Sequence, residues 1–424
     1  MKHAKPLLWL VAFDQRPFHY PPQGLLVTAQ AAKTAGWETR VTQFGLDEWE
    51  RYETELRRLE PTALGMSLFA GPRLSAVTRA SRMAGTMGIP VVWGGPLAAT
   101  APTVCAQADI ADLVVTGRSE LDPSGWLSAL AGKTPGSGTE IYEAATCPLS
   151  DRFDPFYPDP TLLDDPESFT IPRPPFAAVG VVSLSRGCRR RCAFCAAPVV
   201  SGGRSRYEPK QVLAAVRFWR QRTAIDVVEF GDDELLDPRY DVRSLVEEIG
   251  LPYYAQLHVR TVTEELADWL VESGCQGVKL GAESGSDRLL ASIRKGCRAD
   301  DIASAVQRLS ARGILTVSTF IAGLPGEQAA DLAATMELAQ AMAATSPRAL
   351  VRFAHFTPYP GTNLWQPSLD LGFQPPARLE DWSRLDTAGA QVPWVPKRDM
   401  DALVNRLNER FYLQRIHSLA RARA

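Results

Sequence analysis

The chain has 424 residues, of which 45% are hydrophobic and 22% charged, and its formal net charge is -2. Its length exceeds that of one typical domain, and this composition is that of a globular protein with a sizeable core. The near-neutral charge argues against an extended nucleic-acid-binding surface. No apolar run reaches transmembrane length, and the run 7–13 is too short for a signal peptide and lacks a small-residue cleavage site.

The seven cysteines are an odd number and are too sparse for a secreted disulfide scaffold. We therefore expect a cytoplasmic protein in a reducing environment.

Short apolar runs alternate with helix-like segments in the first part of the chain. Five runs are predicted to be strands: 7–13, 38–44, 62–69, 89–93 and 112–116. Strands separated by helices indicate a doubly wound parallel sheet, predicted here as a domain over 1–125. Ligands of such sheets bind outside the carboxyl ends of the strands, so the candidate binding loops are 14–23, 67–71, 94–98 and 117–120.

Eight prolines punctuate residues 148–175, where they alternate with acidic and aromatic side chains. Proline disfavours regular helix, and the aromatic residues favour a segment that packs on something over a disordered hinge. We predict an ordered, proline-rich linker over 126–178.

A second series of alternating strands and helices follows the linker. Its predicted strands are 179–185, 225–230, 253–257, 277–280, 314–321 and 349–356. This series predicts a domain over 179–365, followed by a helical extension over 366–424. In that extension, the apolar stripe formed by Leu403, Val404, Leu407 and Phe411 predicts an amphipathic helix.

Three cysteines, Cys188, Cys192 and Cys195, fall within eight residues at the end of the first strand of this series. An odd number of thiols cannot be satisfied by disulfides alone, but a short loop can bring three thiolates around one inorganic centre. Iron–sulfur cubes usually take four cysteines, so three would leave one iron open to a substrate. A zinc loop with a distant fourth ligand and three unrelated core cysteines are the alternatives.

This cysteine spacing, with Phe194 just before the third cysteine, resembles the signature of the radical S-adenosylmethionine (SAM) superfamily. The resemblance implies that the three cysteines hold a [4Fe–4S] cluster whose open iron binds SAM. It also implies a partial (β/α)6 barrel. Reduction by an external flavodoxin- or ferredoxin-like donor would then cleave SAM to a 5′-deoxyadenosyl radical.

The resemblance assigns SAM-binding residues to the loops that follow the later strands. Asp232 and Asp233 would face the SAM ammonium group, and Glu283 and Ser284 would approach SAM. Phe194, Gly323 and Pro325 would flank the adenine. Local alternatives are helix capping by the two aspartates or by Ser284 or Ser286, and a core position for Phe194.

An α/β domain ahead of such a barrel resembles the cobalamin-binding branch of the superfamily. The residues that would line the cobalamin site are Ser67, Gly94, Gly95 and Gly117, with Phe69 where the branch often has leucine. The histidine signature of familiar cobalamin domains is missing, since Asp14 is followed by Gln15 and Arg16. Cobalamin would therefore bind without a histidine ligand, and His19 is expected to be a loop residue.

The resemblance implies a cobalamin-dependent enzyme that methylates an unactivated carbon of a small-molecule or natural-product intermediate. Alternatives are a rearrangement or cyclisation without methyl transfer, and a non-catalytic cobalamin or iron–sulfur sensor. A methylthiotransferase would need three further cysteines in the first domain, which has only Cys105, with Cys147 in the linker. We expect a small-molecule substrate and neither a nucleic-acid nor a membrane partner.

Three further residues carry weaker functional signals. His258 and His355 follow or end predicted strands and are candidates for proton transfer, with a core position as the alternative. Lys295 is interpreted as a solvent-exposed residue of a helix face.

Overall fold

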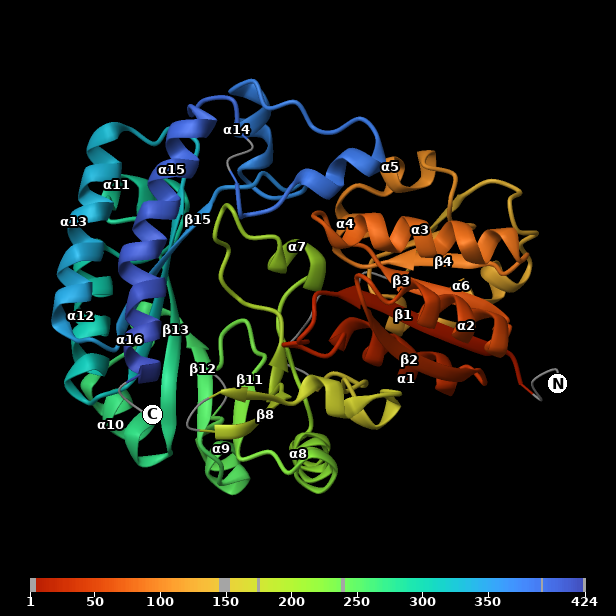
Figure 1. The fold of residues 1–424 in the computed structure, drawn as a ribbon, viewed down its shortest axis with the longest axis horizontal. Coiled ribbons are helices and arrows are strands. Elements are labelled where there is room, and N and C mark those ends of the chain that lie inside the picture. Colours follow the sequence, from red (N-terminus) through yellow and green to blue (C-terminus); the bar gives the residue numbers. More distant parts are fainter. Residues whose placement is uncertain (1–4, 145–152, 174–175, 238–240, 390–391, 422–424) are drawn as a thin grey trace. The chain divides into compact units, whose positions relative to one another are not determined.

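The computed structural model describes residues 5–144, 153–173, 176–237, 241–389 and 392–421 (Figure 1). Its contacts divide the chain into two compact units. Unit 1 comprises Met1–Ile171, Val199–Ala224 and Pro376–Leu385, and unit 2 comprises Pro172–Pro198, Ile225–Pro375 and Asp386–Ala424. The domain limits given above remain a prediction, and Cys147 lies outside the described residues.

Unit 1 contains a six-stranded parallel sheet with the order β2-β1-β3-β4-β5-β6. The strands are β1 (Leu7–Asp14), β2 (Glu38–Gly45), β3 (Ala63–Ser67), β4 (Val91–Gly94), β5 (Leu113–Thr116) and β6 (Glu140–Glu143). The order reverses between β1 and β3, as in a doubly wound sheet. The predicted fold class is therefore confirmed, with β6 as an additional strand that the sequence pattern did not indicate.

Helices and a dense aromatic core complete unit 1. Trp9 stacks on Tyr52 at 5.6 Å between ring centroids, and the Tyr52 hydroxyl donates to the carbonyl of Ala80 at 3.0 Å, which joins α2 to α3. The longer helices are α1 (Gln23–Thr34), α2 (Trp49–Leu59), α3 (Arg73–Thr86), α6 (Pro123–Ala131) and α8 (Pro209–Thr223), and the shorter ones α4 (Pro96–Thr100) and α5 (Pro102–Gln107). Helix α8 follows the cysteine loop in sequence but belongs to unit 1.

Unit 2 contains a seven-stranded sheet with the order β15-β14-β13-β12-β11-β8-β7. The strands are β7 (Ile171–Arg173), β8 (Phe176–Val182), β11 (Val227–Phe230), β12 (Tyr253–Leu257), β13 (Cys275–Glu283), β14 (Leu315–Ala322) and β15 (Ala349–His355). Strand β8 and strands β11 to β15 pair in parallel, and β8 and β15 are not neighbours. This is the predicted partial barrel, a curled sheet that does not close. Strands β9 (Ser185–Arg186) and β10 (Ser205–Arg206) form a separate two-stranded sheet.

One face of this sheet is covered by α10 (Glu264–Glu272), α12 (Ala299–Ala311) and α13 (Ala329–Thr345) (Figure 1). On β14, buried and partly exposed residues alternate, so one face meets the helices and the other does not. Shorter helices are α7 (Ala197–Ser201), α9 (Arg243–Ile249), α11 (Asp287–Ser292) and α14 (Trp365–Asp370).

The C-terminal helical segment runs through α15 (Lys397–Asn408), a π-helical turn (Glu409–Leu413) and α16 (Gln414–Arg421). It buries Val404, Leu407 and Phe411, three of the four residues of the predicted apolar stripe, whereas Leu403 is partly exposed. The Asn408 side chain accepts from the Phe353 N–H at 2.7 Å and donates to its carbonyl at 2.9 Å, and so pairs with the edge of β15.

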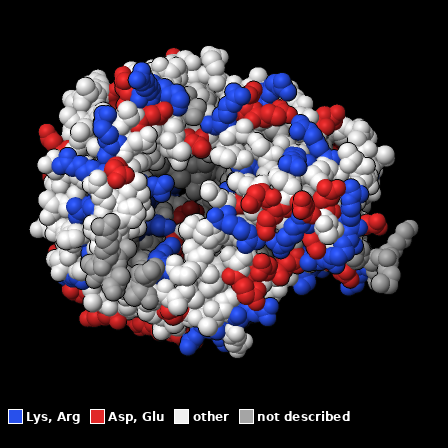
Figure 2. All heavy atoms as spheres, in the orientation of Figure 1, with Lys and Arg blue, Asp and Glu red and all other residues white. Residues whose placement is uncertain are grey.

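Acidic and basic side chains are interspersed over the visible face of unit 1 in Figure 2. On α2, Arg57 pairs with Glu53 and Arg58 with Glu55. Among the described residues, no helix is long and apolar enough to cross a bilayer.

Candidate cofactor sites

The cysteine loop of unit 2 begins beyond β8 and places three free, half-buried thiols close together. Burial, together with the charges of Glu234, Asp233 and Cys192, raises the pKa of the Cys188 thiol to about 11. Burial likewise raises the pKa values of Cys192 and Cys195. Since these thiols oppose each other's ionisation, a bound cationic centre is needed to hold all three as thiolates. The residues therefore fit an iron–sulfur cluster.

The described residues contain no group of three His, Cys, Asp or Glu side chains arranged to hold a single metal ion. A [4Fe–4S] cube does not need such a site, because each of its cysteine thiolates binds a different iron.

Arginines of this loop pair with acids that follow β11. Arg190 forms two hydrogen bonds with Glu234, from Nε and from the terminal nitrogen, both at 3.0 Å. Arg189 Nε lies 2.5 Å from an Asp237 carboxylate oxygen. These two pairs hold the loop against the end of β11. Glu234 and Asp237 pair with arginines far away in the chain, so no local motif singles them out.

The two predicted aspartates after β11 have different surroundings. Asp232 is buried, and its carboxylate accepts from the Leu184 N–H at 3.0 Å and from the Ser185 hydroxyl at 2.5 Å. Both oxygens thus fix the chain where it enters the cysteine loop. Asp233 is exposed, and its charge contributes to the raised pKa values of Cys188 and Cys195. Of the two, Asp233 is better placed to meet a ligand.

A buried ion pair lies beside the cysteine loop at the end of β13. The ladder to β14 shifts register between Gly281 and Glu283, and Glu283 adopts a φ of +63°, which is rare for a residue with a side chain. Its Oε1 lies 2.8 Å from Lys295 Nζ, and the two side chains are only 8% and 7% exposed. The prediction that Lys295 is solvent-exposed is therefore wrong.

Gly281 makes room for this pair. A Cβ on Gly281 would lie 2.4 Å from Glu283 Oε1 and 2.6 Å from Lys295 Nζ. Lys295 also lowers the pKa of Cys192 by its charge, against the larger effect of burial. The pair thus joins the predicted SAM ligand Glu283 to the surroundings of a predicted cluster ligand.

The remaining predicted SAM residues of unit 2 are found in two places, the segment after β13 and an apolar cluster beside the cysteine loop. Ser284 is fully buried, and its hydroxyl lies 3.1 Å from that of Thr335 in α13, while Ser286 caps α11 by accepting from the Leu289 N–H. Phe194 packs against an apolar cluster that includes Leu324. In the sequence, Leu324 stands between the predicted residues Gly323 and Pro325. The structure therefore brings the cysteine loop and the Gly323–Glu327 turn together.

Both candidate histidines are buried, and burial lowers the pKa of each. His258 Nδ1 accepts from the Arg260 N–H at 3.2 Å, and its Nε2 lies 3.1 Å from the Lys295 carbonyl. Burial, aided by the charge of Arg190, lowers the pKa of His258 to about 3. His355 is buried with Nε2 3.3 Å from an Asp401 carboxylate oxygen, and burial also lowers its pKa. Both are core residues.

The predicted cobalamin residues lie on adjacent strand ends of unit 1. Ser67 ends β3, Gly94 ends β4 and Gly117 follows β5. Gly95 has φ +88°, and a Cβ there would lie 2.2 Å from Ser67 Oγ and 3.0 Å from the Leu68 nitrogen. Gly94, Gly95 and Gly117 thus place no side chain at this edge, which fits the close approach of a flat macrocycle. Phe69, two residues beyond Ser67, is an exposed aromatic residue. His19 is an exposed loop residue, as expected.

A buried polar network follows Gly117 and was not predicted. Arg118 donates to Glu120 and to Asp154, both at 2.8 Å, and Ser205 donates to the same Asp154 oxygen at 2.8 Å. The network ties the proline-rich segment, at Asp154, and the segment before α8 to the end of β5. Its members are separated too widely in sequence for a motif to reveal them.

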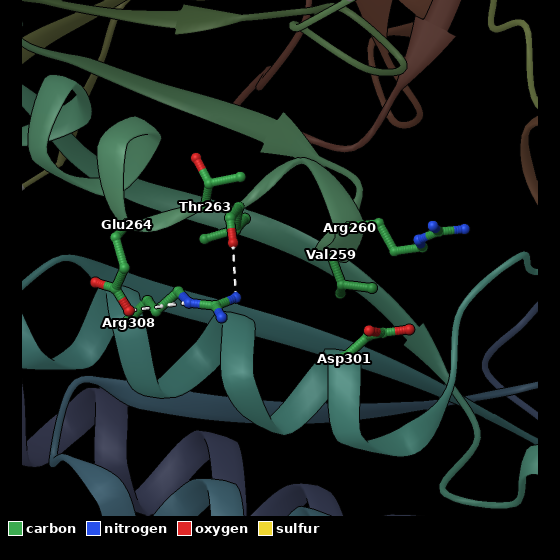
Figure 3. Close-up of a pocket in the computed structure, with 7 residues that line it drawn as sticks. Val259, Arg260, Thr263, Glu264, Asp301 and Arg308 are labelled. Atoms are coloured by element: carbon green, nitrogen blue, oxygen red, sulfur yellow. Dashed lines mark hydrogen bonds and ion pairs between the residues drawn. The ribbon is translucent and has the colours of Figure 1, made fainter.

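A pocket of about 180 Å³ in unit 2 contains none of the predicted site residues (Figure 3). Its polar lining is internally paired, since Arg308 donates to the Glu264 carboxylate and to the Val262 carbonyl, both at 3.0 Å. The lining residues are Val259, Arg260, Val262, Thr263, Glu264, Asp301 and Arg308.

Comparisons with known proteins agree with both sites. Residues 182–339 match the radical SAM superfamily, and residues 10–122 match the B12 binding domain. Over 193 residues, 44% of this chain and 41% of the relative, the chain is 32% identical to an uncharacterized methyltransferase of Pyrococcus horikoshii. It is 27% identical, over 38% of this chain and 33% of the relative, to a tRNA-2-methylthio-N(6)-dimethylallyladenosine synthase of Leifsonia xyli. The chain thus spans less than half the length of these relatives.

Solved structures share the fold at low sequence identity. The radical SAM methyltransferase TsrM of Kitasatospora setae, solved with a tryptophan substrate and a SAM analogue, aligns with a TM-score of 0.68 at 19% identity, over 87% of this chain and 76% of TsrM. The cobalamin-dependent SAM radical enzyme OxsB aligns with a TM-score of 0.58 at 14% identity, over 79% of this chain and 52% of OxsB.

The fold and the two sites define a class of proteins with two cofactor-binding domains. One domain is the parallel sheet with its glycine-lined edge, and the other is the half-barrel with its three clustered thiols. Residues 182–339 form a radical SAM domain and residues 10–122 a B12-binding domain. These two domains imply a [4Fe–4S] cluster, SAM and cobalamin as cofactors.

Proposed function

We propose that this protein is a cobalamin-dependent methyltransferase that transfers the methyl group of SAM to an unactivated carbon of a small molecule. The observation that carries the proposal is that one chain combines three clustered thiols at the mouth of a half-barrel with a glycine-lined B12-binding edge. One relative and one solved neighbour are named as methyltransferases, which favours methyl transfer over rearrangement. Cys105 is the one cysteine among the described residues of the first sheet domain, which disfavours a second cluster of the methylthiotransferase kind.

Each group of residues has a part in this function. When bound, the reduced cluster and SAM supply a hydrogen-abstracting radical, and cobalamin supplies the methyl group. Cys188, Cys192 and Cys195 would hold the cluster, and Asp232 fixes the entry of their loop. Glu283, held by Lys295 through one oxygen, would offer the other to the SAM ammonium group. Phe194 and the Gly323–Glu327 turn would exclude water around the adenine.

Methyl transfer can be tested without knowing the substrate. The protein is reconstituted anaerobically, its iron, sulfide and cobalt are counted, and it is reduced with SAM whose methyl group is deuterated. We expect about four irons and one cobalt per chain, and deuterated methyl on the recovered cobalamin. Cobalamin that stays unlabelled while SAM is cleaved to 5′-deoxyadenosine would favour the rearrangement alternative. Full cofactor loading with no SAM consumption would favour a sensor.

A further inference from the structure

A short segment of the C-terminal extension, residues 392–395, lies against the Gly323–Glu327 turn and is here called the strap. The Trp394 indole Nε1 donates to the Gly323 carbonyl at 3.1 Å. A Cβ placed on Gly323 would lie 3.7 Å from Val392 Cγ2 and 3.8 Å from Val395 Cγ2, which is ordinary van der Waals distance. The strap and the turn both belong to unit 2, so a late part of the chain packs on a turn 71 residues before it.

The strap and the cysteine loop meet in one apolar cluster. Its buried members include Ala193 of the loop, Leu324 of the turn and Val392 of the strap. Phe194 and Trp394 pack against this cluster, and each is only partly buried. The cluster thus gathers side chains of the loop, the turn and the strap where the adenine of SAM is predicted to bind.

Gly323 is fixed by hydrogen bonds on both of its backbone groups. Its φ is +84°, a conformation that residues with a side chain rarely adopt. Its N–H donates to Glu327 Oε2 at 2.6 Å, within the turn, whereas its carbonyl accepts from Trp394. Arg288 donates to the Gly326 carbonyl at 2.8 Å and holds the other end of the turn. Trp394 therefore supplies the hydrogen bond that ties this turn to the C-terminal extension.

The strap itself is anchored to β15 on both sides. Before it, the Thr387 carbonyl accepts from the His355 N–H at 3.0 Å. After it, α15 ends at Asn408, which pairs with Phe353 as described above. Trp394 is thus presented from a fixed support. The strap lies beyond residues 182–339, so the match to the radical SAM superfamily does not account for Trp394.

We propose that Trp394 is a positioning residue for SAM, which acts by holding the Gly323 carbonyl and so fixes the turn that would flank the adenine. The inference rests on the proposed function and adds a residue of the C-terminal extension to its SAM site. A turn already held in its binding conformation loses little further freedom when the ligand arrives, which favours affinity.

Two probes that carry the adenosyl group test the proposal. The binding of S-adenosylhomocysteine and of 5′-deoxyadenosine to the anaerobically reconstituted protein is measured by ligand-observed NMR titration. Trp394→Phe keeps an aromatic ring but removes the indole N–H. We expect it to weaken the binding of both probes by about three- to tenfold, the effect of losing one neutral hydrogen bond. Trp394→Leu, which also removes the ring, should weaken the binding of both probes further.

The second probe and a matched variant separate this role from a general loss of structure. 5′-Deoxyadenosine lacks the amino and carboxylate groups that would bind the open iron, so an effect through the turn should change both affinities by the same factor. Trp269→Phe removes another indole hydrogen bond of unit 2, 3.0 Å long and accepted by Glu247, and should leave both affinities unchanged.

Unchanged affinities in both Trp394 variants would overturn the proposal. Weaker binding of S-adenosylhomocysteine alone would also overturn it, since the effect would then run through the cluster, as would an equal loss in Trp269→Phe or a wild type that binds neither probe. The titration needs neither reductant nor turnover. Unchanged affinities therefore leave methyl transfer standing, and a lack of label transfer to cobalamin leaves the role of Trp394 standing.

Discussion

Lys295 Nζ and Glu283 Oε1 form an ion pair at 2.8 Å in which both side chains are more than nine-tenths buried, next to the cysteine loop. A buried pair of this kind is not itself strong evidence of net stabilisation, because each charge loses its hydration. Removal of one partner has a larger effect, since it leaves the other charge buried and uncompensated.

Lys295→Met should therefore destabilise unit 2 by about 3–5 kcal/mol, whereas the double variant Glu283→Gln/Lys295→Met should recover a large part of that loss. Denaturant unfolding of the single and double variants measures the difference. Lys397→Met, at an exposed position, is the control and should change stability by less than about 0.5 kcal/mol. A Lys295→Met protein as stable as the wild type would show that the pair is not buried as described.

Replacement of any of the three loop cysteines should abolish cluster binding. In Cys188→Ala, Cys192→Ala and Cys195→Ala, we expect the iron content after anaerobic reconstitution to fall to a small fraction of the wild-type value, because a cube with two protein thiolates is weakly held. Cys297→Ala is a demanding control, since this thiol is half-buried and lies near enough to Lys295 and Glu283 for their charges to affect its pKa. Its iron content should match the wild type. Iron retained by all three loop variants would remove the basis of the cofactor assignment.

Two consecutive glycines at the edge of the first sheet should respond differently to alanine. Gly95 combines φ +88° with ψ -175°, a region that residues with a side chain rarely adopt, and its Cβ would meet Ser67 and Leu68. Gly95→Ala should cost about 1–3 kcal/mol of stability and weaken cobalamin binding. At Gly94, the nearest atom to an added Cβ is 3.9 Å away, so Gly94→Ala should fold as the wild type does. Thermal unfolding and a cobalamin absorbance titration compare the stability and the cobalamin affinity of the two variants. Equal stability and equal affinity would contradict the backbone conformation described for Gly95.

Glu327 predicts a pH dependence of stability. Burial raises its pKa from the ordinary value of 4.5 to about 7, although its Oε2 accepts from the Gly323 N–H at 2.6 Å. Because the folded state holds the proton more tightly than the unfolded state, its contribution is fully present below pH 4.5 and is lost as the pH rises to about 7. The wild type should lose about 2–3 kcal/mol relative to Glu327→Gln across this window. A stability difference that is constant with pH would contradict the burial of this carboxyl group.

The sequence predicts those parts of the molecule that depend on local pattern. The strand Tyr253–Leu257 agrees with its predicted limits, and the cysteine spacing leads directly to the loop that the structure places beyond β8. Strand β13 is longer than predicted, because Gly281, Ala282 and Glu283 continue it through a bulge. Small and acidic residues of this kind do not form a pattern that predicts a strand. The polar strand β6 has no apolar alternation to reveal it.

Other features depend on contacts between distant parts of the chain. Lys295 looks like a surface residue until the left-handed backbone at Glu283 brings a carboxylate to it. Helix α8 follows the cysteine loop in the chain, but its assignment to unit 1 rests on tertiary contacts such as the Arg222–Glu167 pair. The family resemblance assigns Asp232 to SAM, and its two hydrogen bonds, from the Leu184 N–H and the Ser185 hydroxyl, could not be predicted because these residues are far away in the chain.

The division of the chain into units affects the order in which the protein can fold during synthesis. The polypeptide passes from one unit to the other after residues 171, 198, 224, 375 and 385. Unit 1 therefore lacks part of its own chain until residue 385 has left the ribosome, even though its sheet is made of early residues. Domains that are continuous in sequence can fold one after the other as they emerge. Here unit 1 is completed only after most of unit 2 has been synthesised.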